Sequence, residues 1–112
     1  MSIAQIQIGG DKEAPQPDPL GRGRIGYFPG VSEAEAWKRG RAVWKLNPQV
    51  ILTKDELQIV NTSGLVLAVG EITGITKAGD RYIVEGNLLQ GDPRVGQQTT
   101  TPHPSQNPVH YP

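Results

Sequence analysis

The amino-acid sequence predicts an α+β protein in which one N-terminal helix packs on a small curled antiparallel sheet or a partly closed barrel, with extended N- and C-terminal tails. Three observations predict it. Helix end signals and apolar spacing occupy residues 32–47, short strand-like runs follow, and proline, glycine and polar residues dominate both ends. We therefore divide the 112 residues into a Pro/Gly-rich arm at 1–23, a compact α+β domain at 24–92 and a Pro-rich tail at 93–112.

The arm begins with an apolar–polar alternation over residues 3–8 that favours an edge strand. Pro15, Pro17 and Pro19 then favour an extended linker. Residues 21–26 match the form G-x-G-x-x-G of a dinucleotide fingerprint. That fingerprint needs a strand before it, and here a proline linker precedes it, so we interpret these residues as a flexible basic hinge.

The helix is predicted from its ends. Ser32 is a good N-cap, and Glu35 three residues later completes a capping box. Asn47 and Pro48 end the helix, because the residue before a proline avoids the helical region.

The helix carries two tryptophans, Trp37 and Trp44, at a spacing that places them on one stripe. This spacing favours two indoles packed in the core; the alternative is that a tryptophan stacks on a nucleic-acid base. Gly40 lies between them and indicates either a close approach of the helix backbone to a sheet or a tolerated surface glycine.

Four strand-like runs are expected to form an antiparallel meander, at residues 49–53, 56–62, 65–75 and 81–86. Ser63–Gly64 and residues 77–80 are the turn signals between the later runs, and Gly70 is a candidate bulge.

Composition excludes several classes of protein. The chain has no cysteine, which excludes disulfides, thiolate chemistry and Cys-based zinc sites. Its longest apolar run, residues 65–69, is too short to cross a bilayer, so we expect no membrane partner. No signal peptide is visible, so we expect the protein in the cytoplasm or in a virion.

We expect no enzyme activity, no catalytic residues, no metal and no cofactor. His103 and His110 are the only histidines, and two prolines and no carboxylate cluster accompany them. Glu71, Asp80 and Glu85 alternate with apolar residues as solvent-facing strand residues do, which leaves no acid/base pair.

The net charge is zero, but basic residues concentrate in the segment 21–45, which holds six of them against Glu33 and Glu35. We predict that these six contact nucleic acid: Arg22, Arg24, Lys38, Arg39, Arg41 and Lys45. The leading hypothesis is therefore a non-catalytic binding protein that contacts nucleic acid through this basic helix face and the loop 91–94. The simpler alternative is a solvated helix face.

Two other functions fit the same composition. Pro-rich tails on a neutral molecule suit a phage or particle structural component, a decoration or assembly protein whose tails bind neighbouring subunits in a homo-oligomeric assembly. An inhibitor of a host protein would use the same surfaces on a protein partner.

Four short blocks, at residues 44–47, 67–72, 82–86 and 106–111, together resemble small uncharacterised proteins of actinobacteria and their phages. The resemblance covers roughly residues 36–111, and those proteins look similar to PUA-like barrels. It implies a small barrel, and the barrel class includes binders of RNA and of modified DNA bases.

Overall fold

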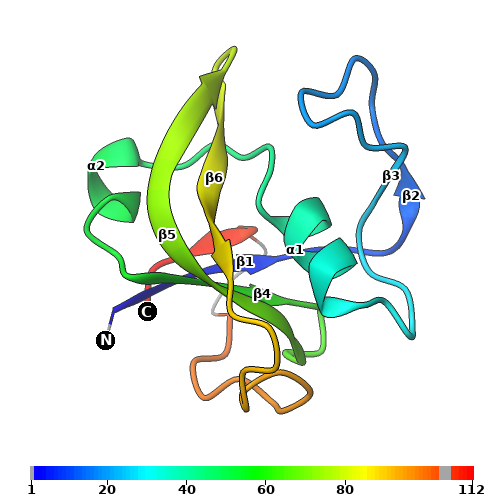
Figure 1. Ribbon diagram of the computed structural model, residues 1–112, viewed down its shortest axis with the longest axis vertical. Helices are drawn as coiled ribbons and strands as arrows, with labels where there is room; N and C mark the ends of the chain where they lie inside the picture. Colours follow the sequence, from blue (N-terminus) through cyan, green and yellow to red (C-terminus); the bar gives the residue numbers. More distant parts are fainter. Residues whose placement is uncertain (1, 104–106) are drawn as a thin grey trace.

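The computed structural model describes residues 2–103 and 107–112; residues 104–106 of the predicted tail, including Gln106 of the closing block, lie outside the described residues. A five-stranded mixed sheet with the order β6-β5-β4-β1-β7 dominates the fold, and β2 and β3 form a separate small sheet (Figure 1). The strands are β1 (Ile3–Gln7), β2 (Lys12–Glu13), β3 (Arg24–Ile25), β4 (Glu56–Val60), β5 (Val66–Ala78), β6 (Arg81–Leu88) and β7 (Val109–His110). The helices are α1 (Glu33–Gly40) and α2 (Pro48–Ile51).

The predicted fold class is wrong. Sheet predominates over helix: 39% of the described residues lie in strands or isolated bridges and 11% lie in helices. The main sheet is mixed because β1 runs parallel to β4, and over the described residues it ends at β6 and β7 without closing into a barrel. Strands, not a helix, begin the fold, so no single N-terminal helix covers an antiparallel sheet.

The first strand explains most of this difference. Residues 3–7 were expected to add at an edge, but β1 lies inside the sheet, with Ile3 to Gln7 paired to Glu56 to Val60 and Gln5 paired to His110. Ala4, Gln5 and Ile6 are fully buried. The predicted arm therefore contributes an internal strand of the main sheet.

Helix α1 begins as predicted, because the Ser32 Oγ accepts a hydrogen bond from the Glu35 backbone N–H at 3.1 Å. It ends at Gly40, and the chain then turns so that Trp44 forms a bridge with Tyr82 of β6. The close-approach interpretation of Gly40 is confirmed, since a Cβ there would lie 2.6 Å from the Ile59 side chain. The helix thus packs directly on the sheet.

The predicted strand at residues 49–53 is wrong, because these residues contribute to helix α2. The Asn47 Oδ1 caps it by accepting from the N–H groups of Gln49 and Val50 at 3.0 and 3.4 Å. Pro48 occupies the first turn, where a missing N–H costs nothing.

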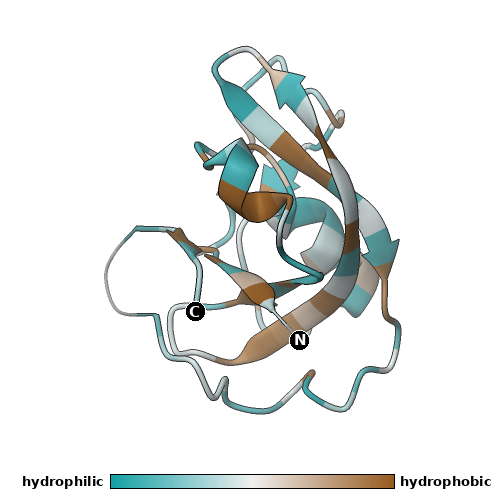
Figure 2. Cartoon of the chain, turned by 90° about the vertical axis from the view of Figure 1, so that its left-hand side faces the viewer, coloured by the Kyte–Doolittle hydropathy of each residue, from teal (hydrophilic) through white to brown (hydrophobic). Residues whose placement is uncertain are grey.

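The remaining predicted strands correspond to β4, β5 and β6, which pair antiparallel in chain order. Gly70 is not a bulge, because the indole of Trp37 packs where its Cβ would be. The register shifts of β5 lie between Ile72 and Gly74 in its pairing with β6 and between Val66 and Ala68 in its pairing with β4. Hydrophobic residues concentrate on the strands, and the long connections are mostly hydrophilic (Figure 2). No helix in residues 2–103 or 107–112 has the length and apolar character needed to cross a bilayer.

The predicted tail packs against the face of the main sheet that lies opposite helix α1. Gln5 and Gln58, both buried, meet there with their side chains 2.8 Å apart, and the Gln5 amide also donates to Thr99 and Thr101. The His103 Nδ1 lies 2.7 Å from the Gln5 Oε1. Both end segments of the chain are therefore bonded to the chain's own sheet.

Candidate functional site

The segment between β1 and α1 folds back on itself beside the helix. Its small sheet pairs Lys12 with Ile25 and Glu13 with Arg24, at the right of Figure 1. Gly26 has φ +87°, and a Cβ there would lie 2.2 Å from the Gly10 carbonyl oxygen. Glycine is therefore required where the two backbones cross.

Arg22 fastens this segment to the end of α1. Its Nη2 lies 2.7 Å from the Asp18 Oδ1, with both side chains almost completely buried. Its Nη1 donates to the carbonyl oxygens of Arg39, at 3.0 Å, and Ala42. The positive guanidinium thus satisfies one carbonyl in the last turn of α1 and one just beyond its end, and its hydrogen bonds lower the pKa of Asp18.

Arg39 forms a second junction. Its Nε donates to Glu35 at 2.7 Å, its Nη1 donates to Asp11 at 3.0 Å and to the Gly26 carbonyl at 3.1 Å, and its guanidinium lies over the ring of Phe28. The side chain is 7% exposed. Hydrogen bonds from Arg24, the largest cause, and from Arg39 lower the pKa of Asp11. Arg39 therefore joins the helix to the small sheet.

Trp44 is held in place at the other side of this junction. Its indole Nε1 donates to the Gly40 carbonyl at 2.7 Å, and its backbone exchanges hydrogen bonds of 3.0 and 2.9 Å with Tyr82. The side chain is half-buried. Because the polar edge of the indole is already bonded, its remaining surface for a ligand is apolar.

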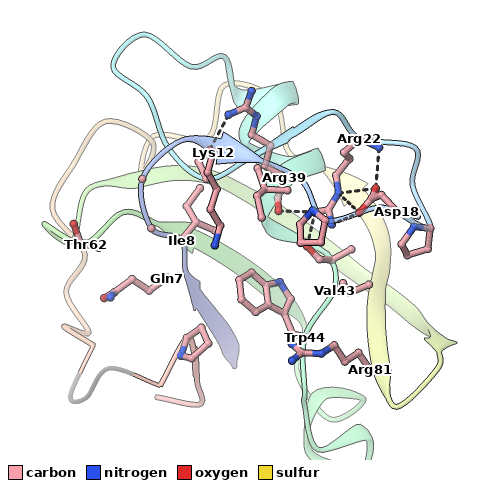
Figure 3. Close-up of a pocket in the computed structure, with 18 of the residues that line it drawn as sticks. Gln7, Ile8, Lys12, Asp18, Arg22, Arg39, Val43, Trp44, Thr62 and Arg81 are labelled. Atoms are coloured by element: carbon pink, nitrogen blue, oxygen red, sulfur yellow. Dashed lines mark hydrogen bonds and ion pairs between the residues drawn. The ribbon is translucent and has the colours of Figure 1, made fainter.

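A groove of about 1040 Å³ opens between the folded-back segment, Trp44 and the start of β6. Four cationic side chains line it: Lys12, Arg22, Arg39 and Arg81. Asp18 is the one carboxylate among its described lining residues, and Arg22 already neutralises it. Figure 3 shows the Trp44 indole between Lys12 and Arg81, with Arg22 and Asp18 to one side.

Lys12 and Arg81 differ from the other lining cations because both are exposed. Neither forms an ion pair with any residue that the structure describes, and the other five arginines all do. The groove therefore carries uncompensated positive charge beside a fixed aromatic ring. A planar anionic ligand matches both features.

The six residues predicted to contact nucleic acid do not form one free basic face. Arg22 and Arg39 are buried and paired. Arg24 pairs with Asp11 at 2.9 Å, and Arg41 pairs with Glu85 at 3.1 Å. Lys38 and Lys45 are exposed, with no ion pair inside the described ranges.

The loop 91–94, predicted as part of the contact surface, is also neutralised. Arg94 lies 2.9 Å from Asp92 and 2.9 Å from Glu56, and these contacts raise the pKa of Arg94 and lower that of Asp92. The charge of Arg94 is therefore already balanced by carboxylates of this chain.

Sequence reasoning missed Lys12 and Arg81. Each lies outside the basic segment 21–45, and only the fold brings both to one groove. Trp44 was considered as a stacking residue, but the helical stripe favoured a core position for both tryptophans. Trp37 is buried at 7% exposure, whereas Trp44 lies beyond the end of α1 and lines the groove.

Over the part of the chain that the structure describes, no three His, Asp or Glu side chains gather as metal ligands would. His103 and His110 pack ring to ring with centroids 5.3 Å apart. Comparisons with protein-family models, curated proteins and solved structures find no match to this chain.

Proposed function

We propose that this protein is a non-catalytic binding protein for nucleic acid, in the cytoplasm or in a virion, and that the groove beside Trp44 is its contact surface. One observation carries the proposal: the uncompensated cations Lys12 and Arg81 line the same groove as a half-buried indole. Phosphates bind such cations, and the bases supply planar surfaces for the indole.

The proposal moves the contact surface away from the helix face. Arg22 and Arg39 have their guanidinium groups bonded to the protein itself, so a phosphate would have to displace buried ion pairs to reach them. Lys38 and Lys45 remain exposed, but neither is among the residues that line the groove.

The two alternative functions stay predictions. Both end segments are bonded to this chain's own sheet, which gives no specific support to tails that bind neighbouring subunits.

The test is fluorescence anisotropy with labelled single-stranded DNA, RNA and duplex DNA over a salt series. We expect binding at micromolar or tighter concentration that weakens as salt rises. Replacing Lys12 or Arg81 by alanine should weaken it and reduce the slope of log K against log salt by about 0.7 for a single strand, the value of one lost phosphate contact.

Lys77→Ala is the matched control, because Lys77 is exposed on the same hairpin as Arg81 and is not a lining residue of the groove. It should bind as the wild type does. Absence of binding to all three nucleic acids at low salt would overturn the proposed function.

A further inference from the structure

We infer that the groove takes a single strand of nucleic acid and that one unpaired base stacks on the face of Trp44. This inference rests on the proposed function and names the form of nucleic acid that the groove selects. Three properties of the groove lead to it: a rigid indole, a lining that includes three prolines, and cations without ion pairs at exposed positions.

The indole is set in advance for stacking. Three hydrogen bonds, one from its Nε1 and two through its backbone, hold Trp44 between Gly40 and Tyr82. The ring therefore loses little conformational freedom when a base covers it. Since its only donor is occupied, it offers a π face and no base-edge hydrogen bond, and stacking on such a face tolerates any base.

The folded-back segment contributes apolar lining to the groove. Pro15, Pro17 and Pro19 line the groove, and proline has no N–H to donate. Val43, which is half-buried, adds apolar surface. The lining therefore offers apolar surface that suits the face of a base, together with polar side chains such as those of Gln7 and Thr62.

The free cations complete the match. Lys12 and Arg81 extend from different strands toward the indole between them, as drawn in Figure 3. Their heads are exposed, so a strand whose base enters the groove keeps its phosphates within reach of solvent-facing ammonium and guanidinium groups.

A duplex does not fit these properties. Its bases are stacked on one another, and their faces are unavailable unless the strand is opened at a cost in stacking energy. The structure therefore points to unpaired DNA or RNA. The two differ by the 2′-hydroxyl, and separate DNA and RNA arms of the experiment distinguish them.

The experiment titrates the full chain with a thymidine oligonucleotide, a uridine oligonucleotide, an abasic oligonucleotide of the same length and a duplex. Tryptophan fluorescence and anisotropy are both recorded. We expect the base-containing single strands to quench the fluorescence and to bind more tightly than the abasic strand and the duplex. Trp37 is buried in the core, so the quenching should disappear in Trp44→Phe.

Two substitutions separate stacking from folding. Trp44→Phe keeps an aromatic face and should retain most of the affinity, whereas Trp44→Leu should weaken it roughly 5- to 150-fold. Thermal unfolding of both variants checks the fold, and the quenching of the wild-type protein tests the inference even where a variant unfolds.

The outcomes separate the two proposals. Equal affinity for the abasic and base-containing strands without quenching would overturn stacking and leave nucleic-acid binding in place. Duplex binding as tight as single-strand binding would also overturn this inference. Failure of every nucleic acid to bind would overturn the inference together with the proposed function.

Discussion

Two pairs of cations line one groove, and the two pairs have different roles. Arg22 and Arg39 are buried and bonded to carboxylates and backbone carbonyls, whereas Lys12 and Arg81 are exposed and without ion pairs among the described residues. The first pair holds the folded-back segment against α1, and the second is available to a ligand. The difference shows that the partners a fold supplies, rather than the density of basic residues in a segment, decide which cations can bind.

The largest expected effect comes from removing a buried cation. Arg22→Leu removes the positive charge that pairs with buried Asp18 and the donor to two carbonyl groups, which should cost about 3–5 kcal/mol of the free energy of unfolding. Arg81→Leu makes the same chemical change at an exposed position and should stay within about 0.5 kcal/mol. Urea unfolding of both variants measures the contrast. Equal losses would show that the buried and exposed pairs do not differ as described.

A smaller loss of stability is expected at Gly26, where its backbone lies against the backbone of Gly10. Gly26→Ala forces a side chain onto a backbone with φ +87° and against the Gly10 carbonyl, so we expect a loss of about 1–3 kcal/mol. Gly23 has open space at its Cβ position and no positive φ, so Gly23→Ala is the control and should be close to neutral. If thermal unfolding finds both variants equally stable, the crossing does not constrain the segment.

The smallest effect concerns pH. Arg22 lowers the pKa of Asp18 in the folded state, so this ion pair stabilises the protein above the unfolded-state value of about 3.9 and loses its contribution as pH falls through the lower folded-state value. The free energy of unfolding of the wild type should therefore fall below about pH 4. In Asp18→Asn the fall should be shallower, because this titrating group is gone. If the free energy of unfolding of the two proteins falls equally below pH 4, the ion pair does not contribute as described.

Local signals were enough to predict the start of α1 but not the chain's second helix. The Ser32 cap acts within three residues, so the sequence shows it directly. Asn47 and Pro48 were interpreted as the end of a helix, although the same residue types also suit the N-cap and first turn of a new one. The strand β1 was recognised by its alternation, but its partners lie far along the chain, and no local pattern reveals them.

The candidate site was predictable only in part. Six basic residues were expected to contact nucleic acid because their charges are visible in the sequence and their partners are not. A carboxylate lies four residues before both Arg22 and Arg39, and this spacing was the available signal for internal pairing. Lys12 and Arg81 meet at one groove through the fold alone.

The position of β1 inside the main sheet also governs how the protein folds during synthesis. On the ribosome, β1 emerges before both of its partners, because it pairs with β4 only after residue 60 has emerged and with β7 only after residue 110. Until then β1, which is buried in the folded protein, has unpaired backbone groups that can associate with other chains. Such distant pairing favours slow completion of the sheet.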